Sequence, residues 1–156
     1  MVDGEHVVNL KEEDDLLEQY VELRNRHRKR LVTGPVQVAE TREWLKRDDL
    51  EIRGIVRSGQ LMGVGILYLS RNAEIAFFTR SGRLGLGSRL LSIIEGVAGG
   101  RGIREVWAWV LSDNIIAQRA FLKNGYRNTC SSAREHEGRI LEGFIFSKTL
   151  PEVEHP

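Results

Sequence analysis

The chain has 156 residues, 41% hydrophobic and 29% charged, a composition typical of one soluble globular domain. Its 23 Lys and Arg residues nearly balance 22 Asp and Glu residues, and a net charge of +1 excludes nucleic-acid or membrane binding through overall charge. The longest apolar stretches, such as residues 64–69, are far shorter than the roughly 18 residues of a membrane span.

The N-terminal residues and the cysteine content favour a cytoplasmic protein. Residues 1–5 are acidic, whereas a secretory signal begins with basic and then apolar residues. The single cysteine, Cys130, has no partner for an internal disulfide. We therefore expect a cytoplasmic location and one domain over residues 1–150, followed by a short tail at residues 151–156.

Hydrophobic periodicity predicts alternating helices and strands. Leu16, Tyr20 and Leu23 repeat at helical spacing, and Leu86 and Leu90 begin a second apolar helix face. The expected elements are a strand at 6–10, helices at 12–28 and 39–47, strands at 51–56, 61–69 and 73–79, a helix from 86 to 100, a strand at 103–111, a helix capped by Asp113 and running to about Asn124, and strands at 126–132 and 139–150. This order, β-α-α-β-β-β-α-β-α-β-β, predicts an α/β (α+β) fold of three layers, in which helices cover both faces of a mixed, mostly antiparallel sheet.

A glycine-rich segment with the spacing G-x-x-G-x-G, at Gly82, Gly85 and Gly87, separates a strand from the long helix. Glycines let a backbone approach a ligand closely, and the helix start that follows offers free N–H groups to an anion. The segment therefore predicts a diphosphate site, with a tight turn without a ligand as the alternative. Ser88-Arg89 replaces the Lys-Ser/Thr of a phosphate loop, and Leu90 replaces the third glycine of a dinucleotide fingerprint, so both of these classes are excluded.

A second motif makes the pattern more specific. Residues 114–126 carry Asn-x-x-Ala, then Phe121 and a terminal Gly-Tyr. The two motifs, in this order and each on its expected element, resemble the GNAT superfamily of acyl-CoA-dependent N-acetyltransferases over nearly the whole chain. Gly82 stands where that family usually has Arg or Gln, and Arg83 is a replacement cation.

The resemblance implies acetyl-CoA as the co-substrate. The loop amides and the helix start would hold its diphosphate, and backbone groups of the preceding strand would pair with the pantetheine arm where two strands splay apart. The cofactor-binding residues implied in this way are Phe77, Phe78, Thr79, Arg83, Leu84, Gly85, Leu86, Gly87, Ser88, Asn114 and Phe121. No metal site is expected, because the four histidines show no ligand spacing.

Finer features resemble one branch of the superfamily. The connection from Phe78 to Gly85 is about one residue shorter than the superfamily norm. Together with residues 23–25 and 43–45, it resembles the branch that acetylates amino sugars on nucleotide carriers, which includes the pseudaminic acid pathway enzyme. This resemblance implies an amino sugar as the acceptor.

An amine attacks a thioester only when it is unprotonated, so the site needs a proton acceptor and a proton donor for the departing thiolate. A family member with Ala-Glu-Ile at the same place uses its glutamate as the base, which makes Glu74 the candidate catalytic residue. The alternative for Glu74 is a solvated carboxylate at a strand end.

The thiolate donor is the main departure from the family pattern. Many relatives have tyrosine where this chain has Phe121, and phenylalanine has no proton to give. Three explanations for the missing donor are open. Water protonates the thiolate, another residue replaces the tyrosine, or the domain binds acyl-CoA without efficient turnover. We expect Tyr126 to belong to the core. We also expect Cys130 to be a small buried residue rather than a nucleophile.

Arg24, Asn25 and Trp109 are the three candidates for binding the acceptor. Trp107 and Trp109 face the same side of one strand, and Trp109 falls where some relatives place a catalytic glutamate, although core packing is the alternative. Arg24 and Asn25 lie on the first helix, which borders the acceptor site in the family. The basic residues 24–30 also match a helix end, and a nucleic-acid role would need more basic surface.

The prediction is an N-acetyltransferase that moves an acetyl group from acetyl-CoA to a primary amine of a small molecule by direct transfer. An amino sugar on a nucleotide carrier is the favoured acceptor. A non-catalytic acyl-CoA-binding or regulatory module is the alternative, and a protein or peptide N-acetyltransferase is a further one. We expect neither nucleic acid nor membrane as a partner, and the sequence leaves open a homodimer formed through edge strands.

Overall fold

The computed structural model describes residues 4–80 and 85–152, so the predictions for Arg83 and Leu84 lie outside the described residues. The strands and main helices are β1 Glu5–Asn9, α1 Leu17–Arg26, α2 Arg28–Leu31, α3 Val38–Trp44, β2 Leu50–Arg57, β3 Gln60–Tyr68, β4 Glu74–Thr79, α4 Leu86–Gly100, β5 Glu105–Leu111, α5 Ile115–Lys123, β6 Arg127–His136 and β7 Arg139–Thr149. The predicted order of elements is confirmed, except that the short helix α2 lies between the two helices predicted before β2.

Two helix starts differ from the prediction. Residues 10–12 and 14–16 form short 3-10 turns, so α1 begins at Leu17 rather than near residue 12. The extended φ of −121° at Glu13 separates the two turns and prevents a continuous helix. The cap of α5 is Asn114 rather than Asp113, because the Asn114 side chain accepts a hydrogen bond from the Ala117 N–H.

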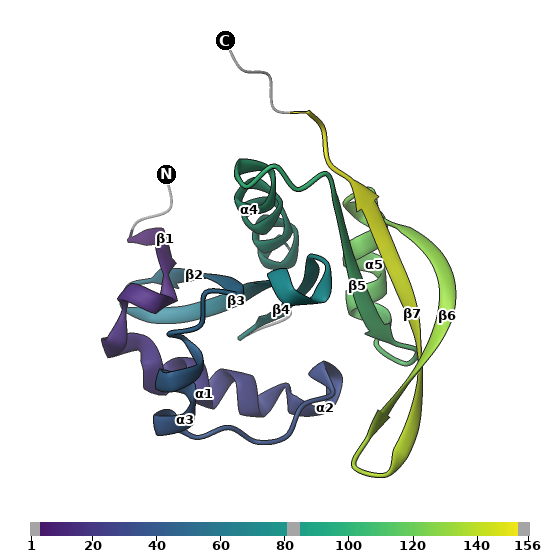
Figure 1. The fold of residues 1–156 in the computed structure, drawn as a ribbon. Helices are drawn as coiled ribbons and strands as arrows, with labels where there is room; N and C mark the ends of the chain where they lie inside the picture. Colours follow the sequence, from purple (N-terminus) through teal and green to yellow (C-terminus); the bar gives the residue numbers. More distant parts are fainter. Residues whose placement is uncertain (1–3, 81–84, 153–156) are drawn as a thin grey trace.

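One seven-stranded sheet organises the molecule, in the order β1-β2-β3-β4-β5-β7-β6. All neighbouring strands are antiparallel except β4 and β5, which run parallel (Figure 1). A parallel connection needs a long crossover, and α4 supplies it between these two strands. The predicted mixed, mostly antiparallel sheet is therefore confirmed.

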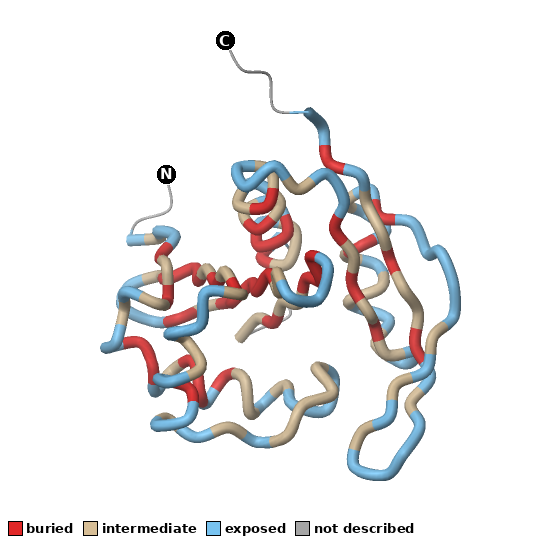
Figure 2. The backbone as a smooth tube through the Cα atoms, viewed as in Figure 1, coloured by how far each residue is buried: buried red, intermediate tan, exposed pale blue. Residues whose placement is uncertain are grey.

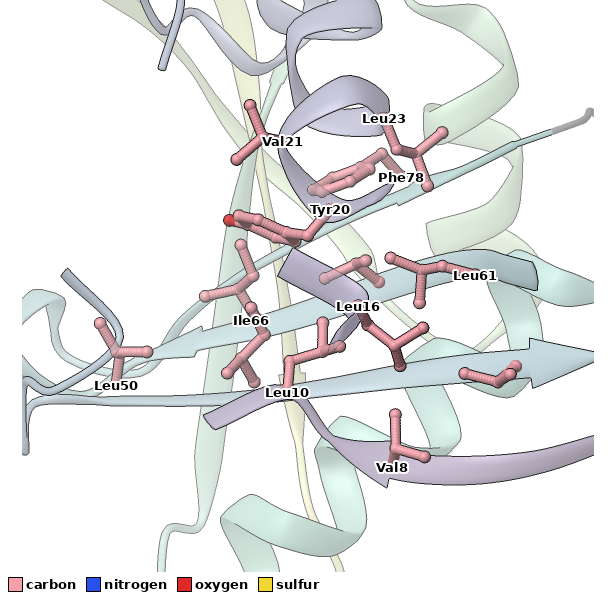
Figure 3. Close-up of a cluster of buried hydrophobic side chains, with 13 residues drawn as sticks. Val8, Leu10, Leu16, Tyr20, Val21, Leu23, Leu50, Leu61, Ile66 and Phe78 are labelled. Carbon is pink, nitrogen blue, oxygen red and sulfur yellow. The ribbon is translucent and has the colours of Figure 1, made fainter. Parts of the chain in front are cut away.

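The helices α1 and α3 cover one face of the first half of the sheet. Leu16, Tyr20 and Leu23 turn toward the strands and pack on Ile66 and Phe78 (Figure 3). All five side chains are buried, as the helical spacing of the first three predicts. This layer fixes the position of α1 relative to β4, and with it the position of the residues that follow Leu23.

The helices α4 and α5 cover the opposite face. Buried residues of α4 and α5 share one cluster with inward side chains of β4, β5 and β7. Two glycines of β3 let α4 lie close to the sheet, because a Cβ at Gly63 would come within 2.9 Å of Leu90 Cδ1 and one at Gly65 within 2.6 Å of Ile94 Cγ1. The sheet is therefore sandwiched between two helical layers, which confirms the three-layer prediction.

The outer hairpin of β6 and β7 is far more exposed than the strands beside it (Figure 2). Cys130 lies exposed on β6, so the expectation that it is buried is wrong. Its strand is the edge of the sheet, which leaves one side of its backbone without a strand partner. No helix within the described ranges is long and apolar enough to cross a membrane.

Candidate active site

The strands β4 and β5 pair at a single point and then separate. Glu74 lies opposite Trp107, and the Trp107 N–H donates to the Ala73 carbonyl at 3.3 Å. Beyond this pair the two strands diverge, so the edge of β4 that faces β5 has no strand partner (Figure 1). The divergence opens the sheet to both of its faces in the middle of the molecule.

A cleft of about 140 Å³ occupies this opening. Its walls come from α1, α2 and the segment after it, β3 and the 3-10 turn that follows it, β4, β5, α5 with its cap, and β6. They are Arg24, Arg30, Leu31, Val32, Thr33, Ile66, Tyr68, Arg71, Glu74, Ile75, Ala76, Phe77, Trp109, Val110, Asn114, Ala117, Phe121 and Arg134. Alternation along β4 and β5 directs Glu74 and Trp109 to the face covered by α1, and Phe77 to the face covered by α4 and α5.

Glu74 begins β4 and has only 4% of its surface exposed. Arg71 Nη1 donates to its Oε1 at 3.3 Å, and Arg134 Nη2 donates to its Oε2 at 2.5 Å. The alternative of a solvated strand-end carboxylate is therefore wrong. Burial of a carboxylate requires such charged partners, and here they come from the loop before β4 and from β6.

Trp109 lines the cleft from β5 and lies flat across the neighbouring strands. Its Nε1 donates to the Ser132 carbonyl at 3.1 Å, which carries the indole over β7 to β6. Gly143 makes this position available, because a Cβ there would lie 2.4 Å from two carbons of the indole. The Arg134 guanidinium covers the ring at 4.8 Å from its centroid.

Arg24 reaches the cleft from α1. Its Nη1 donates to the Tyr20 hydroxyl at 2.6 Å, and its guanidinium lies 5.0 Å from the Trp44 ring. The Nε is buried without a hydrogen-bond partner, and none of the described carboxylates forms an ion pair with Arg24. Burial lowers the pKa of Arg24, but the hydroxyls of Tyr20 and Tyr68 outweigh burial and hold that pKa above its ordinary value.

Asn25, the other acceptor-binding candidate on α1, lies away from the cleft. Its Nδ2 donates to the Val36 carbonyl at 3.0 Å, and its Oδ1 accepts from the Val36 N–H at 2.8 Å. The amide nitrogen and the amide oxygen of this side chain thus both fasten the segment before α3 to α1. Asn25 is a structural residue in this fold.

A family model described as the acetyltransferase (GNAT) family matches residues 13–126, most of the chain. The chain belongs to the GNAT family. It is accordingly an acetyl-CoA-dependent N-acetyltransferase. The match ends at Tyr126, so the β6–β7 hairpin with Arg134 lies outside the matched segment.

Solved structures with the same fold include several GNAT enzymes. Ribosomal-protein-alanine N-acetyltransferase from Brucella melitensis is 18% identical with a TM-score of 0.78, covering 93% of this chain and 99% of that one. Spermidine N-acetyltransferase from Vibrio cholerae, in complex with CoA and spermine, is 13% identical with a TM-score of 0.78, covering 94% and 96%. An acetyltransferase from Salmonella typhimurium that modifies the N-terminal serine of a 50S ribosomal subunit protein is 16% identical with a TM-score of 0.75, covering 96% of each chain. At these identities the likeness establishes the GNAT fold. A search of curated proteins finds no significant match.

The described residues on the α4 side fit acetyl-CoA, the co-substrate of GNAT enzymes. Gly85 caps α4 with a φ of +98°, and no atom of the described residues lies within 4 Å of the position of a Cβ. The first N–H groups of a helix have no partner inside the helix and can bind an anion. A Cβ at Gly87 would lie 3.0 Å from Phe77 Cε2, so this glycine keeps the helix close to β4. The edge of β4 that faces β5 offers backbone groups to an extended arm.

The aromatic residues beside this region are packed tightly. Phe121 contacts Phe77, Tyr126 and Phe146, with ring centroids 5.0 to 5.8 Å apart. The Tyr126 hydroxyl donates to Glu95 at 2.8 Å, and burial raises the pKa of this phenol well above its ordinary value. Tyr126 is therefore a core residue, as predicted, and is a poor proton donor. Thr33 and Tyr68 are the hydroxyl-bearing side chains among the described cleft residues.

Sequence reasoning missed three residues of the cleft, namely Tyr68, Arg71 and Arg134. Arg71 stacks on Tyr68 at 4.1 Å and reaches Glu74 from a short 3-10 turn. Arg134 is 60 residues from Glu74 and lies on an exposed edge strand. Its side chain reaches Glu74 across β5 and β7, which lie between β6 and β4 in the sheet, and no local sequence pattern signals this contact.

Proposed function

We propose that this GNAT enzyme transfers the acetyl group of acetyl-CoA directly to the primary amine of a small molecule. The observation that carries the proposal is the cleft at the divergence of β4 and β5. Its α4 side has the features of a CoA site, and its α1 side holds Glu74, Arg24 and Trp109. Donor and acceptor would thus meet from opposite faces of one sheet.

The reaction transfers one acetyl group and releases one proton. The amine nitrogen forms a bond to the thioester carbonyl carbon, the carbon–sulfur bond breaks, the amine loses a proton and CoA leaves as the thiol. Among the described residues that line the cleft, Glu74 is the one with a carboxylate. It is our candidate to accept the amine proton, directly or through water. The arginines around it also disfavour a protonated amine, because like charges lower the pKa of an ammonium group.

The thiolate needs a proton from outside the aromatic cluster. Phe121 has none, and Tyr126 donates inward to Glu95. We therefore propose that water in the cleft protonates the thiolate, with the Tyr68 hydroxyl as the alternative donor.

Direct transfer is supported by the position of the single cysteine. Cys130 is exposed on the edge strand β6 and is absent from the cleft walls. An acetyl-cysteine route would require a thiol beside the amine site and a base to activate it. A ternary complex of enzyme, acetyl-CoA and amine needs neither.

The size of the cleft favours a small acceptor over a folded protein. A space of about 140 Å³ is suited to a compact molecule or to the head of a longer one. A second hollow of about 470 Å³ lies outside it, between residues 28–35 and the β6–β7 hairpin. A nucleotide-linked amino sugar, the acceptor predicted from the sequence, would place its carrier in this outer hollow beside Arg28, Lys29 and Arg139.

Calorimetric titration with acetyl-CoA and CoA, followed by a thiol-release assay on the same preparation, tests the proposal. The amines are amino acids, amino sugars, nucleotide-linked amino sugars, polyamines and N-terminal peptides. We expect binding of acetyl-CoA and turnover of a small amine. Turnover of peptides alone would indicate a protein N-acetyltransferase, and binding without any turnover would favour a non-catalytic module.

A further inference from the structure

The α1 side of the cleft carries an excess of positive charge. Four arginines line the cleft, namely Arg24, Arg30, Arg71 and Arg134, and Glu74 is the described acidic residue among its walls. The cleft therefore has a formal charge of +3, whereas the whole chain has +1. Charge concentrated in a narrow site with low-dielectric walls attracts a ligand of opposite sign.

The surroundings of Arg24 are the strongest single argument for an anionic ligand. Its side chain is half-buried, its hydrogen-bond acceptors are the hydroxyls of Tyr20 and Tyr68, and its buried Nε has no partner among the described residues. A buried cation without a counter-charge is costly, because burial removes its hydration and no anion replaces it. A ligand oxyanion at the cleft would supply the missing counter-charge.

Arg134 offers a planar donor group over the opposite wall of the cleft. Its guanidinium is held between the face of Trp109, at 4.8 Å, and the carboxylate of Glu74. One nitrogen, Nη2, is used in the bond to Glu74, while a guanidinium has five N–H donors. The fork geometry of the remaining donors matches the two oxygens of a carboxylate or of a phosphate.

We propose that the acceptor is an amine that carries a carboxylate or another compact oxyanion a few bonds from its amino group, bound by Arg24 and Arg134. This inference rests on the proposed function and names the substrate class for the same cleft. Arg71 and Glu74 position Arg134, since all three form one chain of ion pairs. The short distance between amine and oxyanion follows from the size of the cleft. α-Amino acids are the simplest acceptors of this class.

The same charges select against other amines. A polyamine brings additional positive charge into a positively charged cleft, and like charges at close range cost free energy. A free amino sugar is neutral apart from its amine and would leave Arg24 without a counter-charge. The specificity is located on α1 and on β6, and β6 lies beyond the segment matched by the family model.

This inference can be tested with pairs of acceptors in which the two members differ only in the oxyanion. Each proteinogenic α-amino acid is assayed beside its carboxamide, and phosphoethanolamine beside ethanolamine, by thiol release at saturating acetyl-CoA. The amine of a carboxamide is more readily deprotonated, so intrinsic reactivity favours the amide. A preference for the acid therefore reports binding of the carboxylate. We expect kcat/KM to be about 10- to 100-fold higher for the charged member of the best pair, the range of a hydrogen-bonded charge.

Two variants connect that preference to the proposed residues. Arg24→Gln and Arg134→Gln should each reduce the ratio of acid to amide by about tenfold or more, mainly through the KM for the acceptor, while the KM for acetyl-CoA stays unchanged. Arg42→Gln is the matched control, because Arg42 is exposed on α3 and pairs with Asp14. Arg24→Lys keeps the positive charge and replaces Arg24→Gln in the test if Arg24→Gln does not fold. The Lys variant should lose part of the preference for the acid over the amide.

Amine-free ligands separate this inference from the proposed function. The 2-hydroxy analogue of the best amino acid should compete with the acceptor in the wild-type enzyme and should lose potency in Arg134→Gln. Equal turnover of acids and amides, or a best acceptor such as spermidine, overturns the inference and leaves the proposed function intact. A preference that survives both arginine variants overturns the assignment to these residues. If acetyl-CoA binds but no amine gives thiol release, the proposed function is wrong. In that case, failure of the 2-hydroxy acids to bind overturns the inference independently of catalysis.

Discussion

Arg134 Nη2 donates to Glu74 Oε2 at 2.5 Å and so joins β6 to β4 across the point where the sheet divides. The two residues are 60 positions apart in sequence, and the strands β5 and β7 lie between theirs in the sheet. The pair closes one wall of the cleft and places a carboxylate and a guanidinium side by side. In the proposed function, this one contact would connect proton transfer with acceptor binding.

Glu74→Gln separates the two roles of this carboxylate. We expect kcat to fall by about 100-fold, the lower range for loss of a general base, while the Kd for CoA is unchanged because Glu74 faces the α1 side. Calorimetry and the pH profile of kcat measure both effects. A rise in acceptor KM with an unaltered kcat and pH profile would instead make Glu74 a positioning residue for Arg134.

Gly85→Ala tests the start of α4 as the site of the CoA diphosphate. The φ of +98° is strained for alanine although the added methyl group meets no atom, so the loop should shift and the Kd for CoA should rise about tenfold. Gly59→Ala is the control, because it has a φ of +77°, open space and a position in the turn between β2 and β3. Equal effects of both variants on CoA affinity would contradict the assignment.

Tyr126→Phe tests whether this phenol protonates the thiolate. We expect kcat to remain within about twofold of wild type, because the hydroxyl donates to Glu95 inside the fold. Loss of that hydrogen bond should lower the free energy of unfolding by about 1 kcal/mol. Urea unfolding and steady-state kinetics measure the two quantities. A large fall in kcat with little change in stability would return Tyr126 to the reaction.

His27 predicts a pH dependence of stability. Burial lowers the pKa of His27 from 6.5, and its Nε2 lies 2.8 Å from the Thr79 carbonyl, so the neutral ring donates this hydrogen bond. The unfolded chain then binds a proton at a higher pH than the folded chain does. The stability supplied by neutral His27 is therefore full above pH 6.5 and declines as the pH falls below it.

His27→Gln isolates this contribution from that of other titrating groups. The wild-type Tm should fall more steeply between pH 7.5 and pH 5 than the Tm of the variant, because glutamine does not titrate. The difference between the two melting curves is the quantity to compare. Parallel curves over this range would show that His27 does not couple protonation to folding.

Local patterns in the sequence predicted the order of the elements and several parts of the site. Leu16, directly before α1, and Tyr20 and Leu23 on α1 are all buried, as their spacing indicates, and Gly125 ends α5 with a positive φ. These predictions are correct because helix periodicity and glycine conformation depend on near neighbours in the chain. The same local reasoning failed at Asp113, where Asn114 forms the cap, and at Cys130, which is exposed.

The acceptor side of the cleft was decided by tertiary structure. Arg24 is one of two arginines on α1, and only the packing of α1 in the fold places its guanidinium beside Tyr20 and buries its Nε, whereas Asn25 beside it is turned to Val36. Arg134 reaches Glu74 although β5 and β7 lie between their strands in the sheet, a contact that only the folded sheet creates. The sequence by itself determined the GNAT fold and the glycine-rich helix start, since these rest on contiguous residues. The charge of the acceptor site depends on residues brought together from three distant strands and helices, which only the folded chain places in contact.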